Sequence, residues 1–288
     1  MNKKVIDIIK AVSAVVLLTI LNVYIPFLSL FVLIVWPIPI VLTTIKHGPK
    51  EAAIVVAIAA LINGLVFSPL MGLMAVVGFG FIGFVLGSSI NEDLSPIKIL
   101  IFTILTVFLS QTLILTISIQ FLGFDINQIV NESMTAVMGS PQIDELILTQ
   151  IKSVIKSIIP AILFISSVLV GVVNYYITMW YINRIGIEKK TFKDIKLWNF
   201  PKWIISLGIL ITLMFSQNTI LLNLNIILSF FAFIQGFSVG LYYVNKKGNM
   251  FLNILYVFIV FLIPLLPFAL ILVGLVDMWF DFRKLKIN

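Results

Sequence analysis

Cysteine is absent from this 288-residue sequence, and histidine occurs once, at position 47. Zinc, haem and iron–sulfur sites are built from several thiolates and imidazoles, so we expect no metal site and no cofactor. Charge is also scarce, because Asp, Glu, Lys and Arg together supply 11% of the residues, against roughly 25% in soluble domains. A soluble globular domain is therefore excluded.

Motifs for enzymatic chemistry are missing as well. The sequence has no glycine-rich phosphate loop ending in Lys-Ser or Lys-Thr and no His-Glu-x-x-His motif, so hydrolysis of ATP by the common loop or zinc-dependent proteolysis is not expected. No pairing of a nucleophile with a base stands out, which favours a protein that is not an enzyme. If a process here needs energy, a partner must supply it.

Apolar residues are abundant, at 61% of the chain. Because a membrane helix takes roughly 20 residues, this content allows about nine crossings. The prediction is an all-α, polytopic transmembrane bundle of about 8 to 10 spans, forming one integral domain over residues 1–288. The abundance of Ile, Asn and Lys suggests a bacterial protein, so we expect it in the bacterial cell membrane.

Proline and polar residues divide the apolar runs. Pro26 ends a first, uncleaved helix, Trp36 and Pro37 make the second span irregular, and Ser68 with Pro69 forms a tight hairpin. The predicted spans are 8–24, 27–44, 52–67, 70–88, 97–121, 154–182, 203–215, 221–244 and 251–276. The last contains Pro264 and Pro267, so the alternative is a hairpin of two short helices, 251–263 and 268–280.

Basic residues favour a cytoplasmic N-terminus, since cytoplasmic loops retain Lys and Arg. With the C-terminal hairpin, only Lys152 and Lys156 fall outside. In a membrane protein the net charge of +7 serves orientation first, so binding of nucleic acid is not expected. The plan comprises a six-span core (1–185), a basic cytoplasmic loop (186–202) and additional helices (203–288).

Two loops have distinct compositions. The outer loop 123–150 has acidic residues, no basic residue and apolar residues at helical spacing, which fits a helix on the membrane surface or a lid over an outward cavity. The cytoplasmic loop mixes lysines with aromatic residues, which fits contact with anionic lipid or docking of a partner. Its candidate contact residues are Lys189, Lys190, Lys193, Lys196, Trp198 and Trp203.

Neutral polar residues inside the predicted spans are the candidate ligand-binding groups. Ionisable residues at mid-depth, which mark proton and ion relays, are missing from the interiors of the first eight spans. Neutral side chains can bond helix to helix or line a cavity for a small neutral or zwitterionic solute. The candidates for such a lining are Asn174, Tyr175, Gln235, Asn63 and Gln111.

Other residues have simpler interpretations. His47 lies in a short predicted cytoplasmic turn and is interpreted as a headgroup-level residue. Asp277 and Asp281 share a helix face, and we expect them to pair with Arg283, Lys284 or a loop lysine. Small residues four apart predict close helix packing, or a surface between molecules, at Gly83 with Gly87, Gly236 with Gly240, and Ala53 with Ala57.

Four stretches carry a resemblance to a known family: WPIPIVLTTIKHGPKEA at 36–52, NFPKW at 199–203, FIQGFSVGLYY at 233–243 and LVGLVDMWFDFRKL at 272–285. They look like the YybS-type family of uncharacterised bacterial integral membrane proteins. That family is distantly similar to the S components of energy-coupling factor vitamin transporters. In these proteins the first helix often presents an Ala-x-x-x-Ala face, whereas here Ala11 and Ala14 are three apart.

The resemblance implies an S-component-like core with extra helices. It also implies capture of a small solute from outside, for uptake driven by a coupling-factor transmembrane subunit and its ATPases. No ligand residue of the S components matches a numbered position here. The alternative is a non-transporting scaffold or assembly factor with envelope proteins as partners, which the small-residue faces and the basic loop would serve.

Overall fold

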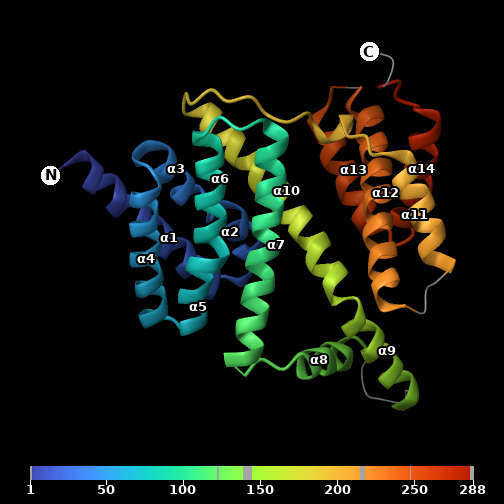
Figure 1. Ribbon diagram of the computed structural model, residues 1–288, viewed down its shortest axis with the longest axis horizontal. Coiled ribbons are helices and arrows are strands. Elements are labelled where there is room, and N and C mark those ends of the chain that lie inside the picture. Colours follow the sequence, from blue (N-terminus) through green and yellow to red (C-terminus); the bar gives the residue numbers. More distant parts are fainter. Residues whose placement is uncertain (1, 122, 139–144, 215–217, 247, 286–288) are drawn as a thin grey trace. The chain divides into compact units, whose positions relative to one another are not determined.

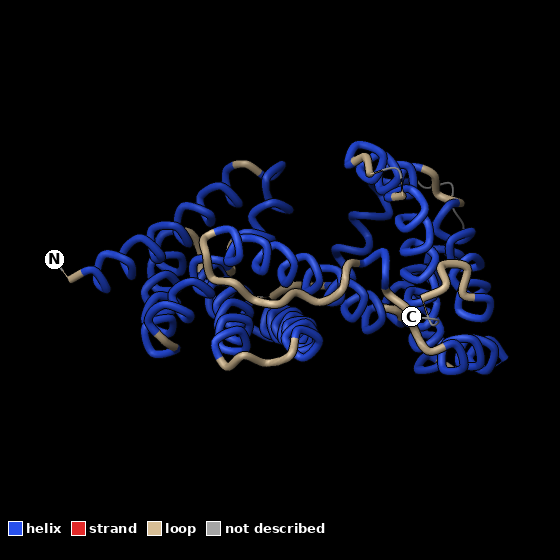
Figure 2. Tube along the Cα trace, turned by 90° about the horizontal axis from the view of Figure 1, so that it is seen from above, coloured by secondary structure: helices blue, strands red, loops and turns tan. Residues whose placement is uncertain are grey.

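The computed structural model describes residues 2–121, 123–138, 145–214, 218–246 and 248–285. Within these ranges the chain forms helices joined by loops, without a β-strand (Figures 1 and 2). The predicted all-α class is confirmed. Two compact units divide the chain: unit 1 comprises Met1–Asp144 and Ser166–Phe192, and unit 2 comprises Glu145–Ile165 and Lys193–Asn288.

Unit 1 contains the N-terminal helices and most of the long helix α10. Its elements are α1 (Lys3–Tyr24), η1 (Pro26–Leu28), α2 (Ser29–Val35), α3 (Ile38–His47), α4 (Pro49–Val66), α5 (Pro69–Leu73), η2 (Met74–Gly80), α6 (Phe81–Asn91), α7 (Pro96–Phe121), α8 (Ile126–Met138) and α10 (Ile159–Arg184). The short segment η2 is π-helical and joins α5 to α6. Helix α3 packs against both α4 and α6.

Unit 2 contains the C-terminal helices. Its elements are α9 (Glu145–Ser157), the start of α10, η3 (Ile195–Leu197), α11 (Lys202–Met214), α12 (Thr219–Asn245), α13 (Met250–Leu262) and α14 (Leu266–Phe280). Helix α12 packs along α14 and α11. A small apolar cluster at these contacts includes Ile205, Leu228 and Met278.

Six described helices are long and apolar enough to cross a membrane, and a bent pair raises the number to seven. The predicted count of 8 to 10 spans is not confirmed, because two of the predicted spans are interrupted or short. The predicted span 27–44 breaks between α2 and α3 at Trp36, and α11 has 13 residues. At 1.5 Å per residue α11 is about 20 Å long, shorter than a hydrocarbon core of about 30 Å.

The last apolar segment folds as two short helices. α13 and α14 flank Pro264 and are bent by 113° relative to each other. The predicted break into two short helices is confirmed, whether the pair forms one broken span or a hairpin. Proline accounts for the break, since Pro264 and Pro267 lack the N–H that a continuous helix needs.

Glycines provide the closest helix contacts. A Cβ atom on Gly83 would lie 2.8 Å from Ile40 Cβ, and one on Gly87 would lie 2.7 Å from Thr44 Cβ, so α6 and α3 approach closely there. Gly236 and Gly240 similarly face the backbone of Leu270 and the ring of Tyr256. The packing interpretation of both glycine pairs is confirmed. The third predicted small-residue face, Ala53 with Ala57, does not pack against another helix of the described chain, because both residues are exposed.

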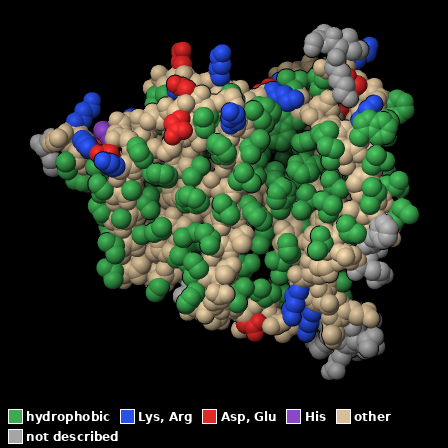
Figure 3. Space-filling model, viewed as in Figure 1, with side chains coloured by type: hydrophobic (Ala, Val, Ile, Leu, Met, Phe, Trp, Pro, Cys, Tyr) green, Lys and Arg blue, Asp and Glu red, His purple; other side chains and the backbone are tan. Residues whose placement is uncertain are grey.

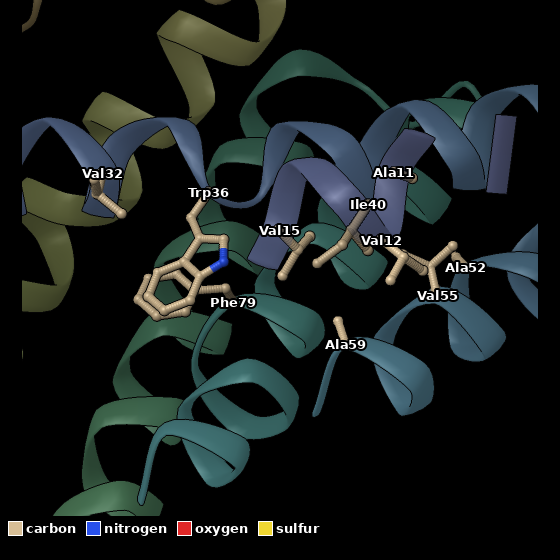
Figure 4. Packing of buried hydrophobic residues seen from close by; sticks show 10 residues of the cluster. All are labelled: Ala11, Val12, Val15, Val32, Trp36, Ile40, Ala52, Val55, Ala59 and Phe79. Atoms are coloured by element: carbon tan, nitrogen blue, oxygen red, sulfur yellow. The ribbon is translucent and has the colours of Figure 1, made fainter. Parts of the chain in front are cut away.

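The apolar core of unit 1 centres on two aromatic rings. Trp36, at the break between α2 and α3, stacks on Phe79 of η2 with 3.8 Å between ring centroids. Figure 4 shows these rings beside Val15 of α1 and Ala59 of α4. The turn between α2 and α3 therefore contacts the π-helical segment η2 through the stacked rings of Trp36 and Phe79.

The outer surface of unit 1 suits a lipid environment. Large apolar side chains such as Leu61, Leu65 and Leu109 are exposed along the helices. On the face of unit 1 seen in Figure 3, hydrophobic side chains cover the flanks of the helices and charged side chains gather at their ends. Soluble proteins rarely expose so large an apolar area, so this surface fits a multi-pass membrane protein.

Orientation can be tested because the sequence has no cysteine. Lys50 lies in the first turn of α4 and Ser68 follows its C-terminal end, and the helix is 18 residues or about 27 Å long. If basic ends are cytoplasmic, a membrane-impermeant maleimide on intact cells should label Ser68→Cys and leave Lys50→Cys unlabelled. Permeabilised cells should label both variants, and the parent chain serves as the blank. The reverse pattern on intact cells would place the N-terminus outside.

Candidate functional site

Unit 1 holds a cavity of about 820 Å³ between α1, α2, α3 and the last turns of α10. Most of its lining is apolar. Among its lining residues, charged side chains and the His47 imidazole lie only in the N-terminal half of α1 and at the C-terminal end of α3. The lining includes Asp7, Lys10, Ala11, Ala14, Leu17, Phe31, Lys46, His47, Ile177, Trp180 and Tyr181.

Small side chains on α1 make room for this cavity. Ala11 and Ala14 line it, followed one turn later by Leu17 and Leu18, so one face of α1 forms the wall. Larger residues at the two alanine positions would fill part of the space. Helices α2 and α3 supply further lining residues, among them Val35 of α2 and Leu42 of α3.

The polar end of the cavity is tied together by side-chain pairs. His47 Nε2 and Asp7 Oδ2 lie 3.0 Å apart and join α3 to α1. Lys4 also pairs with Glu51 and joins α1 to α4. His47 was interpreted from the sequence as a headgroup-level residue, and the structure adds that it has a specific partner.

Two lysines lie at this end, and both act on the Asp7 carboxylate by longer-range attraction rather than by a close ion pair. Within the residues that the structure describes, neither Lys10 nor Lys46 takes part in an ion pair. Both side chains are exposed and both line the cavity. With the Asp7 carboxylate engaged by His47, the polar end has a net positive charge. Such an end favours an anionic group.

The opening of the cavity is apolar. Among its lining residues, Leu17, Phe31 and Trp180 are 55%, 58% and 58% exposed. These three come from α1, α2 and α10, so the cavity opens through the flank of the unit. The guanidinium of Arg184 lies 5.3 Å from the centre of the Trp180 ring, a cation–π contact at this opening.

The five neutral residues singled out from the sequence do not line this cavity. In unit 1, Gln111 accepts hydrogen bonds from Ser166 and Ser167, and the Tyr175 hydroxyl accepts one from the backbone N–H of Phe192. The first contact joins two helices and the second joins a helix to a loop. Asn174 donates to the Val170 carbonyl one turn earlier in the same helix, and its Oδ1 atom has no partner among the described residues.

Asn63 differs from the other candidates. Its side chain is fully buried on α4, and neither its amide nitrogen nor its amide oxygen has a hydrogen-bond partner. It follows Ala59 by one turn on the face that packs in the core. An unpartnered buried amide costs free energy, and we have no physical account of its presence.

Gln235 belongs to a buried polar cluster of unit 2. Its Nε2 atom donates to Asp277 Oδ2 at 2.6 Å, and its Oε1 atom accepts from the N–H of Phe200. Asp277 also pairs with Arg283 at 2.9 Å, and both side chains are almost completely buried. The predicted pairing of Asp277 with Arg283 is confirmed.

Arg283 also binds the loop that precedes α11. Its guanidinium donates to the carbonyl groups of Lys196 and Trp198 and to the Ser238 hydroxyl. Trp198 is buried and its indole N–H donates to the Lys193 carbonyl. This ring was expected at the membrane surface, and its burial corrects that interpretation. Through these hydrogen bonds and its ion pair with Asp277, Arg283 links the loop, α12 and α14.

The remaining loop candidates have different surroundings. Lys189 pairs with Asp93, and its backbone is held by the side chain of Asn183. Lys190 is exposed. Trp203 is 57% exposed and packs edge-on against Trp279, with 4.7 Å between the ring centroids. An exposed pair of indole rings fits a membrane interface.

Comparison with known proteins identifies the family. Residues 13–278 match the DUF2232 model, which is described as a predicted membrane protein. The chain belongs to the DUF2232 family. It is also 25% identical over 298 residues to the uncharacterized protein YybS of Bacillus subtilis (strain 168), which covers 95% of each chain. The resemblance to the YybS-type family is thus confirmed for this DUF2232 protein, and no solved structure matches it.

Proposed function

We propose that this DUF2232 protein is the ligand-binding component of a membrane transport process and that it holds its ligand in the unit 1 cavity. The cavity is the observation that carries the proposal. Its volume of about 820 Å³ lies within the range of roughly 300–1,000 Å³ usual for small-molecule sites. The missing phosphate loop and the distant similarity to S components support a partner that supplies energy.

The lining indicates the chemistry of the ligand. A mostly apolar wall favours an apolar body, and the net positive charge that Lys10 and Lys46 leave beside Asp7 favours one anionic group at the polar end. This differs from the small neutral or zwitterionic solute that the sequence suggested. Capture from outside is a further part of the sequence hypothesis, and the basic, cytoplasmic-type end of the cavity does not favour it.

The first test measures ligand binding by thermal stability in mild detergent. A panel of amphiphilic carboxylates and phosphates should contain compounds that raise the melting temperature of the parent protein. Ala14→Phe fills the cavity, so it should abolish that rise. Ala57→Phe makes the same change at an exposed position of α4 and should retain it. Equal stabilisation of both variants, or none of the parent, would refute the site.

The second test concerns the partner. Affinity purification from native membranes with mass spectrometry should recover coupling-factor ATPases or another energising subunit. The scaffold alternative rests on one observation, the exposed small-residue face of Ala53 and Ala57 on α4. Recovery of envelope-synthesis proteins without any bound small molecule would favour that alternative over the transport proposal.

A further inference from the structure

We infer that the ligand of this cavity is an anionic membrane lipid that enters sideways from the leaflet at the basic end of unit 1. Its headgroup lies at Lys10 and Lys46, and part of one chain lies along Leu17 and Phe31. This inference rests on the proposed function, because it assigns the ligand class of the same site.

The position of the opening carries the first step. Leu17, Phe31 and Trp180 line the cavity and are each more than half exposed. On a membrane protein, exposed apolar flanks face lipid chains rather than water. The polar end is also open, because Lys10 and Lys46 are exposed, but only a lipid has a chain that already lies beside the apolar flank. The geometry therefore favours entry from the bilayer.

The distribution of charge along α1 carries the second step. Lys10 and Leu17 are seven residues apart, or about 10 Å along the helix axis. Lysine near a helix end lies at headgroup level, so the lining passes from headgroup depth to hydrocarbon depth within that distance. A lipid has the same order of groups along its length, with an anionic phosphate above an apolar chain.

The sign of the charge selects among lipids. The charged and imidazole groups that line this end are Asp7, Lys10, Lys46 and His47, and the one lining carboxylate is paired with the imidazole. Two ammonium groups against one carboxylate leave a net positive charge, which attracts an anionic phosphate. A zwitterionic headgroup also contains a phosphate but brings a cation with it, so it gains less at the same position. We therefore assign an anionic rather than a zwitterionic lipid.

The experiment compares lipid retention by native mass spectrometry. Parent protein is reconstituted with equal amounts of phosphatidylglycerol and phosphatidylcholine, then extracted and washed. It should retain one phosphatidylglycerol. Reversing both charges with Lys10→Glu and Lys46→Glu should weaken retention at least about 20-fold, since each lysine near a surface contributes roughly five-fold. The control reverses Lys50 and Lys98, two exposed lysines outside the cavity lining, and should retain the lipid.

A second measurement uses the parent protein and does not depend on the folding of a variant. Phosphatidylglycerol with a photoreactive diazirine in one acyl chain should crosslink to the α1 and α10 segments that line the cavity, around Leu17 and Ile177. Crosslinks spread evenly over all exposed helices would overturn the inference. Equal retention of phosphatidylcholine, or displacement of the lipid by free glycerol phosphate, would overturn it as well.

The outcomes separate this inference from the proposed function. A water-soluble amphiphile that stabilises the parent protein but not Ala14→Phe, without lipid retention, would leave the binding site in place and remove the lipid assignment. Retained phosphatidylglycerol without any energising partner would support the lipid assignment and remove the transport role.

Discussion

Gly236→Ala should prevent unit 2 from packing correctly, and we expect one of the two largest stability losses from this single methyl group. A Cβ atom on Gly236 would lie 1.9 Å from the Leu270 carbonyl oxygen, and one on Gly274 would lie 1.9 Å from that of Ala232. Both obstacles are backbone atoms, which no side-chain rotation can move. The cost should reach about 3 kcal/mol or more, measured as a loss of monodisperse protein and a lower melting temperature.

Gly64→Ala provides the matched control. It makes the same change in a helix of unit 1, where the nearest heavy atom to a new Cβ would be the Gly72 Cα at 3.7 Å, an ordinary contact. This variant should elute and melt like the parent protein. If Gly236→Ala behaved like Gly64→Ala, the close contact between α12 and α14 would not exist in the membrane.

Removing Arg283 should have an effect of similar size. In Arg283→Met the Asp277 carboxylate stays buried, and among the described residues only the Gln235 amide still donates a hydrogen bond to it. The substitution also removes the donor to the carbonyl groups of Lys196 and Trp198. Removing one member of a buried ion pair costs about 3–5 kcal/mol. We expect a matching fall in thermal stability.

A double variant distinguishes charge from packing. Asp277→Leu combined with Arg283→Met removes both charges, so it should be more stable than Arg283→Met alone. Lys284→Met, at the next and exposed position, should be neutral. If the double variant were the less stable one, the unpaired carboxylate would not explain the cost of losing Arg283.

Helix positions followed from the sequence wherever proline or a long apolar run fixed them. Pro264 allowed the pair 251–263 and 268–280 to be stated as an alternative, and α13 and α14 occupy nearly those residues. The span count of 8 to 10 is not confirmed, because an apolar run of 13 residues such as α11 looks like a span in hydropathy. Hydropathy measures composition, whereas crossing a bilayer also requires length.

The candidate site was not predictable by the same reasoning. Neutral polar side chains were predicted to line a cavity, yet Gln235 and Tyr175 form hydrogen bonds within the protein. The partner of Gln235 is 42 residues away in the chain, and no local pattern indicates such a contact. The cavity lining combines Ala14 with residues of α2, α3 and α10. The small side chain of Ala14, rather than a polar residue, leaves room for the cavity.

The contact between α3 and α6 also limits how the family can vary. Gly83 faces Ile40 and Gly87 faces Thr44, with no room for a Cβ atom at either glycine. A relative with alanine at one of these places needs a smaller residue opposite, or a wider helix spacing. Paired changes at 83 with 40 and at 87 with 44 should therefore mark true DUF2232 relatives, even where little other identity persists.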